Sequence, residues 1–173
     1  KAPQREIQEY AWSPDGRWLA YATDTAADTS AVFLYGLETK VSTQVTADGF
    51  DSGEPVFDPG GKLLFVLSDR DVAPTLGRLE RSYTVNRMTR PHAITLRADL
   101  PSPFAPRSDE VKVAEAKEEK KEGDKKEDEK KAKRPVEPLQ VDLAGIQQRI
   151  VPFPIQPGNY PGLTFAKGKL WFL

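Results

Sequence analysis

The sequence predicts an all-β protein, and three features of the chain support this fold class. Two stretches, EYAWSPDGRWLAYATD at residues 9–24 and EPVFDPGGKLLFVLSD at residues 54–69, repeat one pattern at an offset of 45 residues. In each stretch a turn rich in Pro and Gly separates two short apolar runs, and the 3.6-residue period of an amphipathic helix is missing. A repeat of this length made of short strands is typical of the four-stranded antiparallel blade of a β-propeller.

The turn inside each repeat has the chemistry of a type I turn. In SPDG (13–16) and DPGG (58–61), proline presets φ at the second position and glycine accepts the left-handed conformation that follows. The residues that we expect to shape these turns are Pro14, Asp15, Gly16, Pro59, Gly60 and Gly61.

The first blade is predicted to be complete. After the repeat, AVFLYGLETK (31–40) and VSTQVT (41–46) read as two further short strands with a turn near residues 38–40. The second blade is enlarged. About twenty residues separate LLFVL (63–67) from the next strand, HAITLRAD (92–99), and a second insertion follows that strand.

We expect PLQVDLAGIQQRIVPFPI (138–155) to supply outer strands of the second blade. In this alignment Tyr35 corresponds to Val141, and Val45 corresponds to Ile150. A third copy of the pattern begins at Phe165, so the chain would hold about two and a half blades. The boundaries that follow are 1–108 for blades, 109–134 for the insertion, and 135–173 for outer strands and the start of the next blade.

Residues 109–134 form a low-complexity run with ten acidic and ten basic side chains. Because the run has few apolar residues to bury and its charges cancel, we expect a solvated tether, either disordered or an exposed helix. Elsewhere the composition is that of an ordinary globular domain, and the formal net charge of the whole chain is −1. That balance gives no electrostatic reason to expect nucleic acid or an acidic membrane as a partner.

Several kinds of site are not expected. The chain has no cysteine, and no phosphate-cradling glycine pattern or metal-ligand cluster is present. Asp69 and Asp71 are two carboxylates without further oxygen ligands, so we expect them to cap a turn and pair with an arginine. His92 is the only histidine and is expected at a surface position between a loop and a strand. We therefore predict no catalytic, cofactor-binding or metal-binding residue in this chain.

One group of basic residues could contact a ligand. Arg78, Arg81, Arg87 and Arg90, together with Tyr83, lie in the first insertion and could receive the carboxylate end of a peptide. The alternative is that these arginines pair with acidic loops of the same molecule.

The pattern WSPDGRWLAY (12–21) resembles the propeller repeats of the TolB, prolyl oligopeptidase and tricorn protease families. The second blade is more selective. FDPGGKLLFVLSDRD (57–71), TRPHAITLRADLPSPFAP (89–106) and VDLAGIQQRIVPFPIQPGNYPGL (141–163), with the Lys/Glu-rich insertion between them and KGKLWFL at the end, resemble the tricorn-type serine proteases of peptidase family S41.

This resemblance implies a non-catalytic propeller segment, which we place in the second propeller of the parent enzyme, the first being the alternative. The parent would be a serine peptidase that trims oligopeptides, and the propeller would gate or channel them. It also implies oligopeptide substrates, further blades and a catalytic domain as partners, a homo-oligomer, and a cytoplasmic location, with a periplasmic or exported protein as the alternative. The other readings are a TolB-like protein-binding propeller without activity and the propeller of a prolyl oligopeptidase-type hydrolase.

Overall fold

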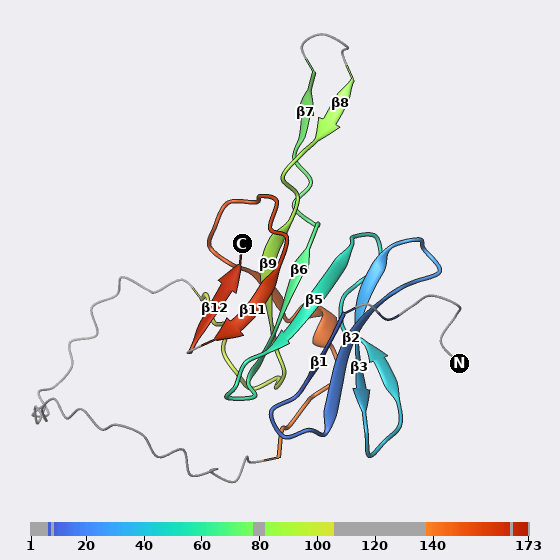
Figure 1. Cartoon of the computed structure of the whole chain (residues 1–173), viewed down its shortest axis with the longest axis vertical. Helices are drawn as coiled ribbons and strands as arrows, with labels where there is room; N and C mark the ends of the chain where they lie inside the picture. Colours follow the sequence, from blue (N-terminus) through green and yellow to red (C-terminus); the bar gives the residue numbers. More distant parts are fainter. Residues whose placement is uncertain (1–6, 8, 78–81, 106–137, 167, 173) are drawn as a thin grey trace, which may run out of the picture.

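The computed structural model describes residues 7, 9–77, 82–105, 138–166 and 168–172, and these form strands arranged in successive antiparallel sheets (Figure 1). The first four-stranded sheet, blade 1, contains β1 (Glu9–Trp12), β2 (Trp18–Asp24), β3 (Ser30–Gly36) and β4 (Ser42–Gln44) in that order. The predicted all-β class and the four-stranded blade are confirmed.

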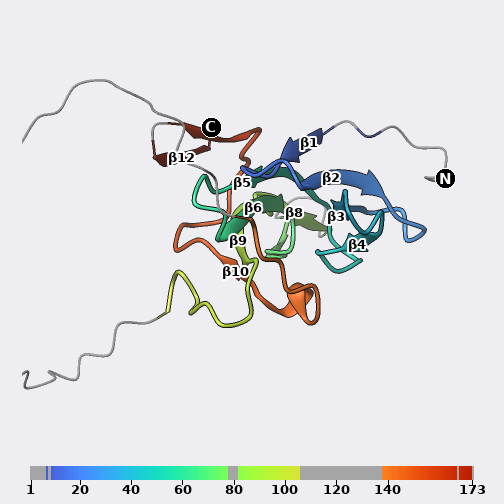
Figure 2. The same ribbon diagram turned by 90° about the horizontal axis from the view of Figure 1, so that it is seen from below.

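Blade 2 is a second four-stranded sheet whose strands come from distant parts of the chain. Its order is β5 (Ser52–Phe57), β6 (Leu63–Ser68), β9 (Arg90–Thr95) and β10 (Ile150–Pro152). Blade 3 is represented by the hairpin of β11 (Leu163–Ala166) and β12 (Lys169–Phe172). Figure 2 shows β1 and β5 on one side of the molecule and β10 on the opposite side, as expected for the inner and outer strands of stacked blades.

The repeat in the sequence corresponds to a repeat in strand pairing. In blade 1 Trp12 pairs with Leu19, and in blade 2 Phe57 pairs with Leu64, which preserves the offset of 45 residues. The connecting turns also match. The N–H of Gly16 donates to the carbonyl of Ser13, and that of Gly61 to the carbonyl of Asp58.

Both turn glycines have a left-handed backbone, with φ of 70° at Gly16 and 66° at Gly61. Pro14 and Pro59 occupy the second position of each turn. The third positions differ, because Asp15 in the first turn is replaced by Gly60 in the second. The carboxylate of Asp15 accepts hydrogen bonds from the Ser13 hydroxyl, at 2.6 Å, and from the Leu139 N–H, at 2.7 Å.

Two apolar cores lie between the blades. The first joins small and aliphatic residues of blade 1 to Phe57, Leu64 and Val66 of blade 2. The second joins Phe65, Leu67 and Ala93 of blade 2 to blade 3, where the Phe65 and Phe165 rings stack with centroids 6.1 Å apart. Each blade is therefore stabilised through its neighbours rather than by a core of its own.

The first insertion of blade 2 contains a hairpin, β7 (Pro74–Leu76) and β8 (Tyr83–Val85), that projects away from the blades (Figure 1). The residues of both strands are exposed. Residues 106–137, which include the charged run and its predicted tether or helix, lie outside the described residues.

The segment after the charged run differs from the expectation of several outer strands. Residues 138–145 form no strand, a 3₁₀ turn follows at Ile146–Gln148, and only β10 joins the sheet. The third strand of blade 2 is β9, so Tyr35 corresponds to Ile94, since both pair with equivalent leucines of the second strand. Val141 instead packs against the first core from the side.

Candidate functional site

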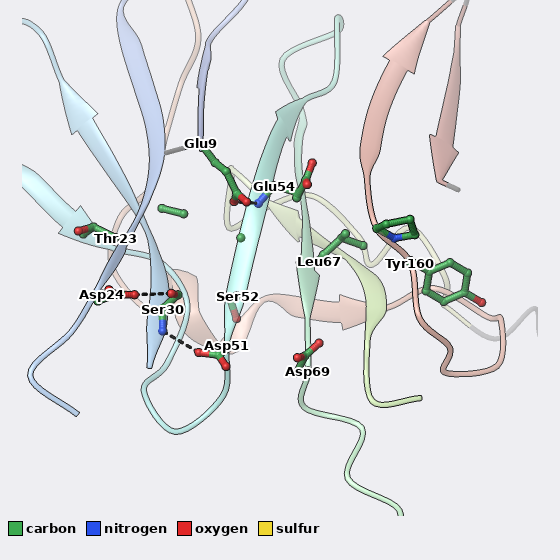
Figure 3. Close-up of a pocket in the computed structure, with 13 residues that line it drawn as sticks. Glu9, Thr23, Asp24, Ser30, Asp51, Ser52, Glu54, Leu67, Asp69 and Tyr160 are labelled. Carbon is green, nitrogen blue, oxygen red and sulfur yellow. Dashed lines mark hydrogen bonds between the residues drawn. The ribbon is translucent and has the colours of Figure 1, made fainter. Parts of the chain in front are cut away.

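A pocket with a volume of about 330 Å³ lies between the first two blades, near the ends of β2 and β6 and the beginnings of β3 and β5 (Figure 3). Blade 1, blade 2 and the loop before blade 3 all contribute to its wall. Its lining includes Glu9, Asp24, Asp51, Glu54, Asp69 and Tyr160.

The pocket is strongly acidic. Of the described residues that line it, five are carboxylates and none is Lys, Arg or His. Because carboxylates concentrated in a concave site create a negative potential, the pocket favours cationic groups and disfavours anions.

Several of these carboxylates are held by hydrogen bonds. The N–H of Ser30 donates to Asp51 Oδ1 at 2.9 Å, and the Ser30 hydroxyl donates to Asp24 Oδ1 at 2.6 Å. The bond to Asp51 connects the start of β3 in blade 1 to the residue before β5, and the bond to Asp24 connects β3 to β2 within blade 1 (Figure 3).

Two glutamates connect successive blades. Glu9 of blade 1 accepts a hydrogen bond from the Glu54 N–H of blade 2, at 2.5 Å from Oε2. Glu54 in turn accepts one from the N–H of Leu163 in blade 3, at 3.3 Å from its own Oε2. We call these two contacts the inter-blade carboxylate bonds. Hydrogen bonds from backbone N–H to an ionised carboxylate are stronger than neutral ones.

The local backbone explains why the Glu54 N–H is available. The pairing of β5 with β6 shifts between Gly53 and Val56, and Glu54 has a left-handed φ of 51°. This bulge turns the Glu54 N–H toward the neighbouring blade. Gly53 makes room for the acceptor, because a Cβ at this position would lie 2.5 Å from Glu9 Oε2.

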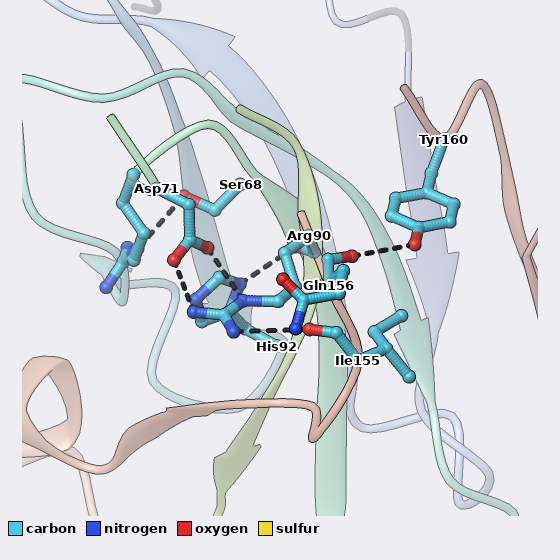
Figure 4. A network of polar contacts seen from close by, with 8 residues as sticks. Ser68, Asp71, Arg90, His92, Ile155, Gln156 and Tyr160 are labelled. Atoms are coloured by element: carbon cyan, nitrogen blue, oxygen red, sulfur yellow. Dashed lines mark hydrogen bonds and ion pairs between the residues drawn. The ribbon is translucent and has the colours of Figure 1, made fainter. Parts of the chain in front are cut away.

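His92 is buried, so the prediction of a surface position is wrong. It lies within β9, is 1% exposed, and contacts the Arg90 carbonyl through Nδ1 at 2.8 Å (Figure 4). Burial lowers the pKa of His92 from 6.5 to about 4, outweighing the hydrogen bond to Arg90, so the imidazole is neutral at pH 7. The reason for the error is strand alternation, which points residue 92 to the same side as Val66 and Ile94.

The polar residues around His92 do not form a hydrolytic triad. The Ser68 hydroxyl contacts that of Ser52, at 2.9 Å, and accepts a hydrogen bond from Arg70 Nε at 3.0 Å. Asp71 is bound by the guanidinium of Arg90 rather than by the imidazole. The hydroxyl, imidazole and carboxylate that a triad needs as nucleophile, base and orienting acid are therefore not hydrogen-bonded to one another here.

The four arginines do not come together as a described site. Arg78 and Arg81 lie outside the described residues, and Arg87 is exposed, with a φ of 58°. Arg90 donates from Nε to Asp71 Oδ2 at 2.7 Å and from Nη1 to the Ile155 carbonyl at 3.3 Å. For Arg90, the alternative of pairing with an acid of the same molecule therefore holds. Tyr83 is 75% exposed on β8.

Sequence reasoning missed the acidic pocket and its glutamates. A signal was present, because the 45-residue offset that aligns the turns also aligns Glu9 with Glu54. What the sequence lacked was any indication that the blades stack closely enough for one glutamate to reach the next strand.

Among the described residues, no group of three or more metal-ligating side chains is close enough to hold an ion. No helix within the same residues has the length and apolar character needed to cross a membrane.

Comparison with known proteins gives a match over the whole chain. The family described as the tricorn protease second β-propeller domain matches residues 1–173. A crystal structure of the tricorn protease superposes with a TM-score of 0.64 at 22% identity, covering 91% of this chain and 14% of that chain. This likeness supports the fold.

Two curated relatives are similar in sequence. A tricorn protease homolog of Saccharolobus solfataricus is 30% identical over 167 residues, covering 96% of this chain and 13% of the relative. Tricorn protease homolog 1 of Streptomyces coelicolor is 30% identical over 161 residues, covering 92% of this chain and 14% of the relative. The chain thus spans only a small part of the length of the relatives it matches.

Proposed function

The chain belongs to the tricorn protease family and matches its second β-propeller domain. We therefore propose that it forms part of the wall of a channel through which oligopeptides reach the peptidase of the full-length protein. The wall contributes no catalytic group in this proposal. It acts by exclusion, since a rigid ring of blades admits short or unfolded peptides and keeps folded chains away from a remote nucleophile.

The observation that carries the proposal is the arrangement of the inner strands. β1, β5 and β11 belong to three successive blades, and β5 is bonded to its neighbours on both sides through the inter-blade carboxylate bonds. A second pocket of about 320 Å³ runs along these strands and is lined by Ala11 and Val56 among others. Inner strands held in this way give a channel wall that does not yield to a passing peptide.

The acidic pocket adds a charge preference to this wall. A peptide that passes it presents either a cationic or an anionic end, and the five carboxylates attract the first and repel the second. We therefore expect peptides with a free amino terminus or with Lys and Arg side chains to be favoured.

The test is to narrow the channel chemically in the full-length protein. Ala11→Cys places a thiol in the pocket along the inner strands, and this part of the chain has no cysteine of its own. Attachment of a bulky maleimide should lower kcat/KM for oligopeptides several-fold and should affect a dipeptide substrate less. The matched control is Val41→Cys, at a 55% exposed position next to the outer strand β4, where attachment should change neither rate.

Two outcomes would reject the proposal. If maleimide attachment at positions 11 and 41 lowered kcat/KM equally, the inner strands would not line a peptide channel. If a fluorophosphonate probe labelled no serine in the full-length protein, the parent would not be a serine peptidase, and a TolB-like binding propeller would explain the fold better. The unsubstituted full-length protein, treated with the same maleimide, provides the baseline for any cysteines outside this chain.

A further inference from the structure

We propose that the hairpin of β7 and β8 binds oligopeptides in extended form. The peptide adds to the free edge of β8 as a third, antiparallel strand, with its amino end toward the acidic pocket. The identity of this occupant rests on the proposed function, because an oligopeptide is the ligand that the channel would carry. Since the hairpin projects away from the blades, this contact precedes entry into the channel (Figure 1).

The pairing pattern of the hairpin decides which backbone groups point outward. The N–H of Gly77 donates to the carbonyl of Ser82 at 2.8 Å, so these two residues form a hydrogen-bonded pair. Such pairs alternate with non-hydrogen-bonded pairs in an antiparallel ladder, and the next pair is Leu76 with Tyr83. The N–H and C=O groups of Tyr83, and those of Val85 two residues later, therefore point away from β7.

The two edges of the hairpin differ in their ability to pair with another strand. β7 has Pro74 at an outward-facing position, and proline has no N–H to donate. β8 contains neither a proline nor a charged residue, which are the usual means of blocking an edge. Within the described residues, these two strands form a sheet by themselves. A strand added to β8 gains up to four backbone hydrogen bonds, two with Tyr83 and two with Val85.

One face of the hairpin is apolar and exposed. Because side chains alternate along a strand, four apolar residues share this face: Pro74, Leu76, Tyr83 and Val85. Leu76 is 57% exposed and Tyr83 is 75% exposed. A two-stranded hairpin is at best marginally stable in water, and a third strand with apolar side chains on the same face stabilises it. We therefore expect a peptide with apolar residues at alternate positions, opposite Tyr83 and Val85.

The acidic pocket determines the direction of the peptide. β6 ends at Ser68 and Asp69 lines the pocket, so the hairpin leaves blade 2 beside these carboxylates. β8 runs toward Arg90 at the base of the hairpin, so the amino end of an antiparallel peptide lies at that base. The five carboxylates attract the ammonium group there, whereas a parallel peptide would bring its carboxylate to them.

The distance from β8 to the pocket sets the length of the peptide. Val85 precedes Arg90 by five residues, and Arg90 pairs with Ser68 at the end of the sheet next to the pocket. At about 3.3 Å per residue, these five residues span at most about 17 Å. A peptide of about eight residues therefore pairs with Tyr83 and Val85 and still reaches the carboxylates.

Hydrogen exchange resolved to single amides tests this contact in the full-length protein. The probe is the octapeptide Thr-Val-Thr-Val-Thr-Val-Thr-Val with a free amino end, and fluorophosphonate is present to prevent its hydrolysis. Without the probe, the amides of Tyr83 and Val85 should exchange almost as fast as those of an unstructured chain. With millimolar probe, both should exchange at least about tenfold more slowly.

Two results of this experiment would overturn the proposal. If both amides exchanged slowly before the probe was added, the edge would already be paired, with a second copy if the protection were lost on dilution and with another part of the polypeptide if it were not. If millimolar probe left both rates unchanged, β8 would not bind the peptide.

A matched pair of proline variants tests the edge itself. Val85→Pro removes one outward N–H without removing a hydrogen bond of the hairpin, so the Kd of the probe should rise about two- to tenfold. Leu76→Pro makes the same change on the outward edge of β7 and should leave the Kd unchanged. An equal rise for both variants would contradict binding at β8.

Modified probes test register and direction without changing the protein. If the valines of the probe pack beside Tyr83 and Val85, their N–H groups face β8, so N-methylation of the valines should weaken binding at least about tenfold. N-methylation of the threonines should have little effect, and acetylation of the amino end should weaken binding several-fold. Equal effects of the two methylation patterns, or no effect of acetylation, would contradict the proposed register or direction.

These measurements are separate from the test of the channel. They report binding at β8, whereas maleimide attachment at position 11 reports passage along the inner strands. Absence of binding at β8, together with the expected effect at position 11, would refute the peptide edge and leave the channel. Binding at β8 without an effect at position 11 would do the reverse.

Discussion

At the scale of single residues, His92 has an unusual position for a titratable group. It occupies the place in blade 2 that Phe33 occupies in blade 1, because both pair with the same position of the second strand. An imidazole takes the place of a phenyl ring there and is neutral, with its Nδ1 on the Arg90 carbonyl. The nearby charges of Arg70 and Arg90 lower its pKa and that of Asp71 raises it, both less than burial lowers it.

This position predicts an acid-dependent loss of stability. The folded pKa of His92 is about 4, below the ordinary value of 6.5, so the unfolded chain binds a proton first as the pH falls. Between these two values the free energy of unfolding should decrease, by up to about 3 kcal/mol in total. His92→Phe should flatten this part of the pH profile, measured by urea unfolding of the propeller in the full-length protein. If the free energy of unfolding of the two proteins changed in parallel with pH, His92 would not be the group responsible for the loss of stability.

Alanine substitutions at the two turn glycines distinguish the energetic cost of a strained backbone from the cost of a side-chain clash. A Cβ added at Gly61 would lie 2.4 Å from Leu139 Cδ1, whereas one added at Gly16 has no atom within 4 Å. Gly16→Ala should cost about 1 kcal/mol through its positive φ alone. Gly61→Ala should cost somewhat more, because the Leu139 Cδ1 methyl group, at the end of a flexible side chain, must also shift. Gly61→Val should destabilise the blade further.

Melting temperatures of the full-length variants provide the measurement. The control is the double variant Gly61→Ala with Leu139→Ala, in which the two effects should not add. Equal decreases in melting temperature for Gly16→Ala and Gly61→Ala would show that the clash with Leu139 does not contribute to the loss of stability.

At the scale of elements, blade 2 accepts two insertions without changing its strand order. The first leaves the sheet after β6 and returns at β9, and the Asp71–Arg90 ion pair closes its base. The second leaves after β9 and returns at β10. Its described ends are fixed by Phe104 on Phe153, with ring centroids 4.6 Å apart, and by the hydrogen bond from Leu139 to Asp15.

These anchors predict that the charged run itself is dispensable for activity. Replacing residues 109–134 by a Gly/Ser linker of equal length leaves both anchors in place, because each lies outside the replaced residues. Peptide hydrolysis and the melting temperature of the full-length protein should stay near their original values. A large loss of activity would mean that the run contacts a partner or substrate.

At the scale of the whole molecule, stability depends on blades that cover one another. Within the described residues, Phe57 and Phe65 lie on opposite faces of blade 2, and each is buried by a different neighbour. In the part of the chain that the structure describes, blade 1 has such a neighbour on one side only, and on its other side Trp12 is 53% exposed.

Much of this arrangement could be predicted, and the errors have identifiable causes. The offset of 45 residues correctly predicted successive blades, because each blade repeats the same turn and strand lengths. The assignment of residues 138–145 to a strand was wrong, because β9 already fills the third position of blade 2. The acidic pocket was not predicted at all, since its carboxylates come from segments that only stacking brings together.

The sequence by itself determined the local features of this protein, namely the Pro- and Gly-containing turns, the strand lengths and their repetition. Those features depend on backbone preferences within a few residues, which composition and spacing reveal directly. Only the tertiary structure decided that His92 is buried, that Arg90 pairs with Asp71, and that Glu9 reaches the Glu54 N–H. These facts depend on strand register and on the approach of neighbouring blades, which no single stretch of sequence contains.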